Sequence, residues 1–283
     1  MNVIVQPRWL LARMYEPDLV IVDCRFQLGA PEAGRKAYEQ DHIPGALYAD
    51  LEADLSAPIT EHGGRHPLPD TQSFAAFIGK LGIGQDTRVV AYDDQGGAFA
   101  ARLWWLLRYH GHQKTYILDG GYAKWNELGY PVSDAKPPVI VPKTFVPDIQ
   151  ADMLVSMQDV RERLGNSGTL LIDSREPRRY RGEEEPIDRK AGHIPGARNL
   201  FWKDVLNSEG MWKSVEEQKQ RLAEAGLDPN SGQEIIVYCG SGVTACPNVL
   251  ALEQAGYRNV KLYAGSWSDW ISYSENPVAT GDE

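Results

Sequence analysis

The residues most able to do chemistry lie in one short segment, Cys239-Gly240-Ser241-Gly242-Val243-Thr244, which we call the cysteine loop. It follows an apolar run at 234–238 and precedes a helix expected from about Ala245. Glycines let backbone N–H groups turn towards one point, and a helix N-terminus adds a partial positive charge. Both features favour a thiolate over a thiol, so the segment predicts a reactive Cys239 in a cradle for an anion bonded to its sulfur. The alternative, a small buried core cysteine, does not require two glycines directly after a strand.

The elements that must position this loop are indicated by an internal repeat. Its period is near half of the 283-residue chain, and four blocks recur in the same order. Such agreement indicates a duplicated domain, because the period exceeds that of solenoid repeats and two copies do not make an array. The paired blocks are 19–23 with 170–173, 42–46 with 193–197, 88–92 with 234–238, and 111–125 with 256–270.

Each copy alternates apolar runs with segments of helical periodicity. The runs ending at Tyr92 and Tyr238 are short and rich in β-branched residues, as is typical of strands buried on both faces. Alternating strands and helices predict the α/β class, with a mainly parallel sheet flanked by helices in each copy. Ligands bind outside the carboxyl ends of such strands, so the residues after Tyr92 and Tyr238 are the expected sites. Apolar residues recur at helical spacing in three segments: Phe74, Phe77, Ile78 and Leu81; Phe99, Leu103, Leu106 and Leu107; and Val249, Leu250 and Leu252.

A proline-rich segment separates the two copies. Prolines stand at positions 137, 138, 142 and 147, and this density disfavours helices and sheet interiors and favours an extended linker. The length of the chain is also that of about two domains. We therefore predict an N-terminal domain at residues 1–134, a linker at 135–150 and a C-terminal domain at 151–283.

The composition argues against several classes of function. Lys and Arg number 29 against 39 Asp and Glu, a formal net charge of −10, and no dense basic run is present. Binding of nucleic acid or of an anionic membrane is therefore not expected. Residues 1–22 contain four charged residues and no apolar run suited to a membrane helix. Three cysteines are too few for a disulfide framework and fit a cytoplasmic protein, and no Cys-x-x-Cys pair or histidine cluster predicts a metal site.

The repeat, the paired His-Ile-Pro-Gly-Ala blocks and the cysteine loop resemble the two-domain sulfurtransferases of the rhodanese family, over essentially the whole chain. The resemblance implies two tandem rhodanese-like domains, of which only the second is catalytic. It implies that Cys239 carries a sulfane sulfur as a persulfide to a thiol or cyanide, without a cofactor. A thioredoxin-like protein is one such thiol acceptor.

The loop sequence also bears on the sulfur donor. Cys-Gly-Ser-Gly-Val-Thr resembles the version found in family members that use 3-mercaptopyruvate. Members that use thiosulfate usually place Arg and Lys where Gly240 and Ser241 stand in this chain. The resemblance therefore favours 3-mercaptopyruvate, with thiosulfate as the alternative.

The resemblance further assigns substrate-binding residues. Arg179 falls where the family's carboxylate-binding arginine stands, and a guanidinium fork matches a carboxylate bidentately. Arg178 is the alternative, since a shift of one residue exchanges the two. Ser241 is expected to donate to the thiolate or to a substrate carbonyl. Gly240, Gly242, Val243 and Thr244 are expected to line the cradle, although Thr244 suits better the cap of the following helix.

A histidine and an arginine complete the expected site. His66 lies in a loop rich in glycine and proline, where family members that use 3-mercaptopyruvate carry a histidine for proton transfer. Asp50 or Glu52 is expected to orient it, and an exposed loop histidine is the alternative. Arg102, with Arg65, is expected to line the cleft, unless Arg102 is a charge on a helix surface.

The first copy is a control within the same chain. It has Asp93 where the second copy has Cys239, and a carboxylate cannot carry a sulfane sulfur. We expect a non-catalytic copy, with Asp93 as a catalytic acid the alternative. Cys246 is expected to pack in its helix rather than to form a disulfide. Four residues that occur in both copies are expected to be structural: His42, His193, Asp23 and Asp173.

Two other functions use a similar loop. A cysteine phosphatase needs an arginine six residues after its cysteine, and this position holds Ala245. A non-catalytic persulfide carrier that serves a partner protein remains an alternative. Turnover with a small donor and a small thiol, in the absence of a partner, distinguishes an enzyme from a carrier.

Overall fold

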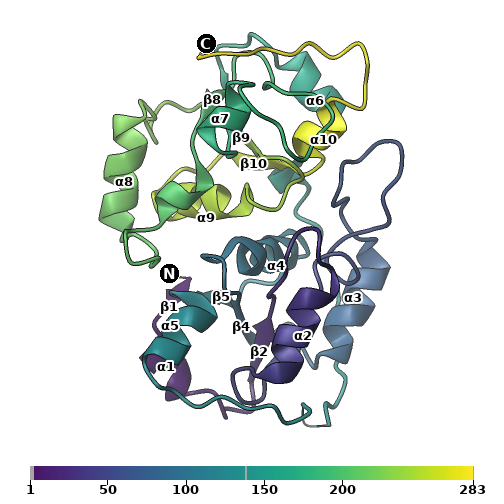
Figure 1. The fold of residues 1–283 in the computed structure, drawn as a ribbon, viewed down its shortest axis with the longest axis vertical. Helices are drawn as coiled ribbons and strands as arrows, with labels where there is room; N and C mark the ends of the chain where they lie inside the picture. Colours follow the sequence, from purple (N-terminus) through teal and green to yellow (C-terminus); the bar gives the residue numbers. More distant parts are fainter. Residues whose placement is uncertain (1–2, 138, 283) are drawn as a thin grey trace. The chain divides into compact units, whose positions relative to one another are not determined.

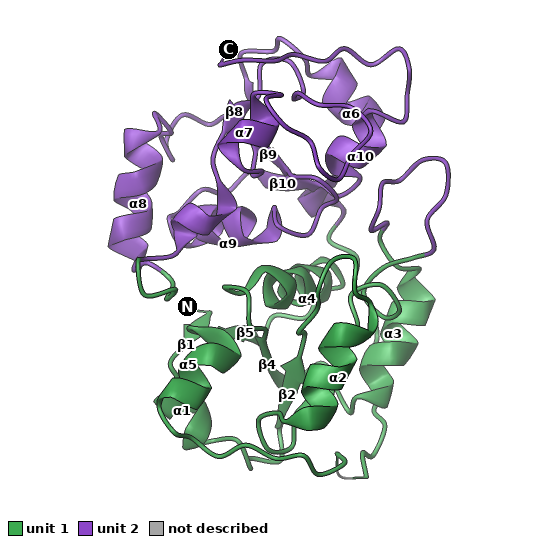
Figure 2. Ribbon diagram, viewed as in Figure 1, with its two compact units in different colours: residues 1–57, 68–150, 208–212 green, residues 58–67, 151–207, 213–283 purple. Residues whose placement is uncertain are grey.

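The structure, a computed structural model, describes residues 3–137 and 139–282, so Pro138 of the predicted linker lies outside the described residues. The chain divides into two compact units (Figure 2). Two short segments do not lie in the unit that corresponds to their predicted domain. Residues 58–67 belong to the second unit and residues 208–212 to the first. The first unit comprises residues 1–57, 68–150 and 208–212, and the second 58–67, 151–207 and 213–283.

The first unit is built on a five-stranded sheet with the order β1-β5-β4-β2-β3 (Figure 1). Every pair of neighbouring strands is parallel, as predicted. The strands are β1 (Ile4–Val5), β2 (Leu19–Asp23), β3 (Leu47–Tyr48), β4 (Arg88–Tyr92) and β5 (Thr115–Leu118). The helices are α1 (Pro7–Leu11), α2 (Glu32–Gln40), α3 (Thr71–Lys80), α4 (Ala98–Tyr109) and α5 (Gly121–Glu127).

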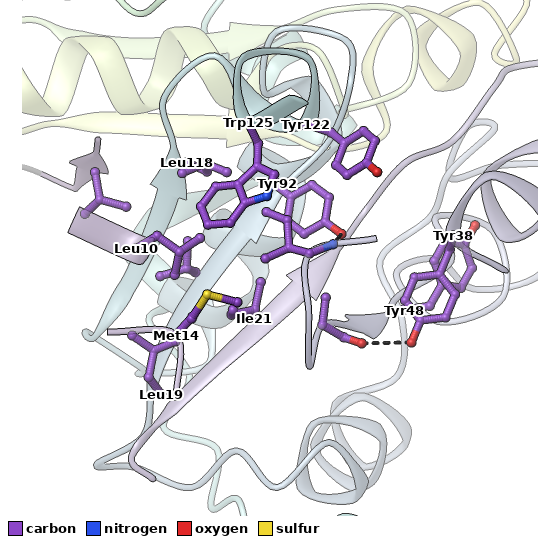
Figure 3. Packing of buried hydrophobic residues seen from close by; sticks show 14 residues of the cluster. Leu10, Met14, Leu19, Ile21, Tyr38, Tyr48, Tyr92, Leu118, Tyr122 and Trp125 are labelled. Carbon is purple, nitrogen blue, oxygen red and sulfur yellow. Dashed lines mark hydrogen bonds between the residues drawn. The ribbon is translucent and has the colours of Figure 1, made fainter. Parts of the chain in front are cut away.

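The core of the first unit lies between this sheet and its helices. Leu10 of α1, Tyr38 of α2 and Trp125 of α5 pack in one cluster with Ile21 of β2 and Tyr92 of β4 (Figure 3). Successive side chains of a strand point to opposite faces, so these three helices share one face of the sheet. Helix α4 is buried along most of its length and contacts β4 and β5. The predicted α/β class is confirmed.

The second unit repeats this architecture. Its sheet has the order β6-β10-β9-β7-β8, again with parallel neighbours. The strands are β6 (Leu154–Val155), β7 (Thr169–Asp173), β8 (Arg198–Asn199), β9 (Glu234–Tyr238) and β10 (Val260–Tyr263). The α-helices are α6 (Met157–Glu162), α7 (Pro177–Tyr180), α8 (Val215–Glu224), α9 (Cys246–Gln254) and α10 (Ser266–Trp270), and 3₁₀ turns η1 and η2 span Ala151–Met153 and Trp202–Val205.

The two sheets also share their register. Asp23 pairs with Tyr92 across β2 and β4, and Asp173 pairs with Tyr238 across β7 and β9. The carboxyl ends of β7 and β9 are therefore neighbours. This places the residues that follow Asp173 beside the cysteine loop that follows Tyr238.

Residues repeated in both copies have matching structural contacts. His42 Nδ1 lies 2.7 Å from the carbonyl oxygen of Tyr38, and His193 Nδ1 lies 2.8 Å from that of Tyr180. Each imidazole stacks on the ring of the same tyrosine. Each histidine also forms an isolated antiparallel bridge, His42 with Ser133 and His193 with Ala279. These contacts agree with the predicted structural role.

The repeated aspartates hold buried arginines at the strand ends. Asp23 forms an ion pair of 2.7 Å with Arg25, and Asp173 forms one of 2.6 Å with Arg175. Burial opposes the charge on Arg175, but Asp173 outweighs it, and the pKa of Arg175 lies above its ordinary value. A buried pair with this many hydrogen bonds fixes the backbone beyond the strand. The geometry fits the structural role predicted for both aspartates.

Candidate active site

The cysteine loop leaves β9 at its carboxyl end and leads into α9. Its backbone requires a glycine at one position, because Gly242 has a φ of 75° and a Cβ there would collide with the carbonyl of Ala264. The prediction that Thr244 caps the helix is wrong. Helix α9 begins at Cys246 with Ala245 at the N-cap, and no side-chain hydrogen bond caps it. The reason is that the loop extends one residue beyond Thr244, which leaves its hydroxyl outside the cap position.

Cys239 itself is 1% exposed and is held by the residues that begin α10. Its N–H donates to Ser266 Oγ at 3.1 Å, and its carbonyl accepts from the N–H of Trp267 at 3.0 Å. Ser266 has a φ of 56°, a conformation that is unfavourable for a residue with a side chain. The equivalent residue in the first unit is Gly121, with a φ of 55°. The second unit thus has a strained backbone at Ser266, and the hydroxyl of this residue accepts the hydrogen bond from the N–H of Cys239.

The equivalent loop of the first unit shows what such a backbone binds. The carboxylate of Asp93 accepts hydrogen bonds from the N–H groups of Gln95 and Gly97, each 2.8 Å long. It also accepts from Phe99 at 2.8 Å and Ala100 at 3.0 Å in α4. Burial raises the pKa of Asp93 above its ordinary value, although these four donors oppose that shift. The backbone after β4 is therefore arranged around an anion, as predicted for the loop after β9.

The two loops differ in length. The first loop covers residues 93–97 between β4 and α4, which is five residues, whereas the second covers 239–245 between β9 and α9, which is seven. The shorter loop closes around a carboxylate that belongs to the chain itself. The longer one surrounds a thiol, whose sulfur can form a further covalent bond.

His66 is brought to the cysteine loop from a distant part of the sequence. Its Nδ1 lies 2.7 Å from Ser241 Oγ, and both side chains are buried. The alternative of an exposed loop histidine is wrong, because segment 58–67 packs within the second unit. A hydroxyl bonded to an imidazole is an arrangement suited to proton transfer.

Segment 58–67 is fastened to α10 and to the residues that follow it. The N–H of Gly63 donates to Asp269 Oδ1 at 2.7 Å, and the N–H of Arg65 donates to Ser268 Oγ at 3.1 Å. His62 stacks on Tyr273 with ring centroids 4.0 Å apart. These contacts fix the backbone on both sides of Gly64 and hence the position of His66. The sequence pattern shows a loop here but contains no signal for its partners.

Arg179 and Arg178 point to different surroundings. A Cβ built on Gly240 would lie 3.7 Å from Nη2 of Arg179 and 2.9 Å from Nη2 of Arg65, so both guanidinium groups border the cysteine loop. The side chain of Arg178 is 60% exposed and pairs with Glu183 and Glu184. Of the two arginines, it is therefore Arg179 that borders the cysteine loop.

Two buried carboxylates, Glu185 and Asp188, connect these arginines. Glu185 accepts from Arg179 Nη2 at 2.7 Å and from its Nε at 3.1 Å. Asp188 accepts from Arg179 Nη2 at 3.0 Å through one oxygen and from Arg65 Nη1 through the other. The carboxylate side chains of Glu185 and Asp188 are 4% and 3% exposed. Sequence reasoning missed both, because the stretch Glu183-Glu184-Glu185 resembles an ordinary solvated acidic surface.

The pKa values of the two carboxylates are shifted in opposite directions from their ordinary values. Burial alone would raise the pKa of Glu185, but Arg179 and the N–H groups of Ile187 and Asp188 outweigh it, and the pKa falls below its ordinary value. Burial dominates at Asp188 and, together with the neighbouring Glu185, raises its pKa despite Arg65, Arg179 and Arg175. The surroundings therefore shift the pKa values of these two carboxylates in opposite directions.

The remaining predicted residues lie apart from this network or in the first unit. Arg102 is 0% exposed in α4 and donates to the carbonyl of Leu55 at 3.3 Å, so the alternative of a helix-surface charge is wrong. Asp50 accepts from the N–H groups of Glu52 and Ala53, both at 2.9 Å. Their roles beside the cysteine loop stay predictions. Cys246 Sγ lies 3.4 Å from the carbonyl oxygen of Gly242, and Cys24, Cys239 and Cys246 are not joined by disulfides.

Within residues 3–137 and 139–282, no group of three or more His, Cys, Asp or Glu side chains is arranged to hold a metal ion. None of the helices described is both long and apolar enough to cross a bilayer.

Comparisons with known proteins agree with this architecture. A model of the rhodanese-like domain matches residues 6–128 and again residues 156–273. The chain is 46% identical over 275 residues to a Pseudomonas aeruginosa protein named "Probable 3-mercaptopyruvate sulfurtransferase", covering 96% of each chain. It is 33% identical over 279 residues to the thiosulfate sulfurtransferase of Mus musculus, covering 95% of this chain and 91% of that one.

A solved structure gives the same result. The crystal structure of SseA from Escherichia coli, described as a 3-mercaptopyruvate sulfotransferase with the "Rhodanese" fold, superposes with a TM-score of 0.80. It is 33% identical in sequence, and the match covers 95% of this chain and 100% of that chain. The duplicated parallel sheets, the loop after β9 and these similarities lead to one conclusion: the chain belongs to the rhodanese family and consists of two rhodanese-like domains.

Proposed function

We propose that the protein is a sulfurtransferase that takes a sulfane sulfur from 3-mercaptopyruvate and passes it, through a persulfide on Cys239, to a thiol or to cyanide. The observation that carries this proposal is a buried cysteine at the carboxyl end of β9, in the loop whose counterpart in the first unit binds a carboxylate through four N–H groups. Similarity to enzymes named for this activity supports it.

The first half-reaction transfers sulfur to the enzyme. The Cys239 thiolate attacks the sulfur of 3-mercaptopyruvate, and an S–S bond forms while the C–S bond breaks. The electron pair of the C–S bond goes to carbon, which leaves as the enolate of pyruvate. One proton then converts the enolate to pyruvate, and the outer sulfur stays on Cys239 as a persulfide held by the loop N–H groups.

The proton of this step has a route in the site. Ser241 and His66 form a bonded pair beside the cysteine loop, and we propose that it carries the proton between the donor's thiol and the enolate. Arg179 holds the donor's carboxylate, and its bidentate pairing with Glu185 keeps the guanidinium in place. Gly240, Gly242 and Val243 supply backbone to the cradle.

The second half-reaction returns the free enzyme. An acceptor thiolate or cyanide attacks the outer sulfur of the persulfide, the S–S bond breaks, and its electron pair restores the Cys239 thiolate. The two half-reactions share one cysteine, so the kinetics should be ping-pong. We also propose a cytoplasmic location, where small thiols and thioredoxin-like proteins are available as acceptors.

The donor is tested with the wild-type enzyme. We expect a higher kcat/KM for 3-mercaptopyruvate than for thiosulfate, by roughly 5–150-fold, because thiosulfate is a compact dianion and Gly240 and Ser241 add no side-chain cation. Steady-state kinetics on both donors with the same acceptor measure this ratio. A larger kcat/KM for thiosulfate would make the protein a thiosulfate sulfurtransferase. Persulfide formation without turnover on cyanide or a small thiol would indicate a carrier.

The role of His66 is tested through the glycine that positions it. Gly64 has a φ of 80°, and a Cβ there would collide with the carbonyl of Gly265 and lie 2.9 Å from Ser268 Oγ. Gly64→Ala should displace His66 and lower kcat for 3-mercaptopyruvate by roughly 10²-fold, since small misplacements of a catalytic group are costly. Stopped-flow and steady-state kinetics with that donor provide the measurement.

A neighbouring glycine is the matched control for this variant. Gly63 has a φ of 94°, so Gly63→Ala carries similar backbone strain, but its Cβ would meet only Pro67, at 3.7 Å. We expect Gly63→Ala to retain most of the activity. Equal losses in both variants would show that general loop strain, and not the position of His66, controls the rate.

A further inference from the structure

A buried carboxylate lies directly against the loop that is proposed to hold the transferred sulfur. A Cβ on Gly240 would lie 3.7 Å from Asp188 Oδ2, the same distance as from Nη2 of Arg179. A site that binds anions would ordinarily exclude such a group, because a negative charge repels the substrate. Binding of the donor's carboxylate by Arg179 does not by itself explain why Asp188 lies beside Gly240.

The charges around Gly240 nearly cancel. Arg65 and Arg179 contribute two positive charges, and Glu185 and Asp188 contribute two negative ones within hydrogen-bonding distance of them. Arg175 also contacts Glu185, at 3.4 Å, but its charge is balanced by its closer partner Asp173, at 2.6 Å. The arginines thus offer the directed donors of a guanidinium fork without an excess of positive charge.

We propose that Asp188 determines donor specificity: its carboxylate neutralises the Arg65–Arg179 pair, so that the site accepts a donor with one negative charge and rejects a dianion. This inference rests on the proposed function and deepens it. It explains how two arginines can border the cysteine loop of an enzyme for 3-mercaptopyruvate. A monoanion needs the geometry of one fork, whereas a dianion also needs a net positive field.

The direct test is Asp188→Asn, which keeps the shape of the side chain and removes its charge. The kcat/KM ratio of thiosulfate to 3-mercaptopyruvate should rise by roughly 5–100-fold, because the network gains one net positive charge. Glu183→Gln is the matched control. It removes the same charge five residues earlier, from a side chain that is half exposed and pairs with Arg178 and Arg181, so the ratio should not change.

A second readout does not depend on sulfur transfer. Iodoacetate and iodoacetamide both alkylate a thiolate with loss of iodide, but only iodoacetate is an anion. The ratio of their rates at Cys239 should rise in Asp188→Asn by roughly 5–100-fold. Failure of the wild type to transfer sulfur from either donor would refute the proposed function alone. A rise in the alkylation ratio would support the inference even in that case. Sulfur transfer with both ratios unchanged in Asp188→Asn would overturn the inference and leave the proposed function standing.

The wild-type enzyme provides a test that needs no Asp188 variant. Burial and Glu185 raise the pKa of Asp188, against the opposing effects of Arg65, Arg179 and Arg175. As the pH falls, Asp188 becomes neutral and the network becomes positive. The iodoacetate-to-iodoacetamide ratio should therefore rise with falling pH, and the ionisation of Cys239 cancels in it.

The same pH series is then measured with the variant His66→Asn. This variant lacks the nearby imidazole, so a charge on that ring cannot contribute to the ratio. A rise that persists in this variant supports Asp188 as its source. A ratio that is flat with pH in His66→Asn would overturn the inference.

Discussion

Replacement of Cys239 by serine should abolish sulfur transfer, because an alcohol cannot form a persulfide. The loss should reach the detection limit, since the whole covalent pathway depends on this atom. The variant should fold, because Cys239 is held by backbone hydrogen bonds to Ser266 and Trp267. A serine at this position keeps the N–H and C=O groups that form them. Steady-state assays with 3-mercaptopyruvate and thiosulfate measure the loss.

Mass spectrometry identifies the intermediate. Incubation of the wild type with donor, without acceptor, should add the mass of one sulfur atom to the peptide that contains Cys239. Cys246→Ser is the matched control, since this thiol is also buried and lies one helical turn from the loop at Gly242. Normal transfer by Cys239→Ser, or sulfur found on Cys246 instead, would refute the assignment of the nucleophile.

Removal of the guanidinium of Arg179 should also produce a large effect. Arg179→Ala is expected to lower kcat/KM for 3-mercaptopyruvate by roughly 10²-fold, which corresponds to about 2.7 kcal/mol of lost transition-state binding. The rate at which the neutral reagent iodoacetamide alkylates Cys239 should change little. A parallel fall in both rates would mean that Arg179 acts on the thiolate and not on the donor's carboxylate.

Two further variants separate binding from folding. Arg179 is the closest ion-pair partner of the buried Glu185, so Arg179→Ala also removes much of the charge that balances this carboxylate. Arg179→Lys restores a positive charge but not the fork, and it should recover thermal stability with only part of the activity. Arg178→Ala should have little effect, because Arg178 is exposed. A large loss in Arg178→Ala alone would transfer the assignment to that residue.

The parts of the candidate site that depend on local backbone chemistry can be seen in the sequence. Gly242 has the positive φ that its residue type suggests, and Cys239 follows a strand whose apolar pattern is plain in the sequence. The duplication adds information, since the first copy has Asp93 where the second copy has Cys239. The error at Thr244 has the same local origin: a shift of one residue in the helix start moves a hydroxyl out of the cap position.

The choice between Arg178 and Arg179 needed three-dimensional structure. Both belong to α7, a helix of four residues, and adjacent residues of a helix point about 100° apart. A helix of four residues is about one turn long, so its sequence shows no repeated apolar pattern that would identify the face that packs inward. Only the packing of Tyr180, which is buried, fixes the rotation that leaves Arg178 in solvent and Arg179 beside Gly240.

The sequence by itself predicted the two α/β domains, which the structure confirms, and a nucleophilic Cys239 in an anion-binding loop, because each prediction rests on residues adjacent in the chain or on a repeat of them. The tertiary structure decided what surrounds that cysteine. His66 meets Ser241 across 175 positions, and Arg65 meets Asp188 across 123. Such contacts leave no periodic signal, since they form only when segment 58–67 docks on α10. The set of charges that borders the loop is for that reason a property of the fold.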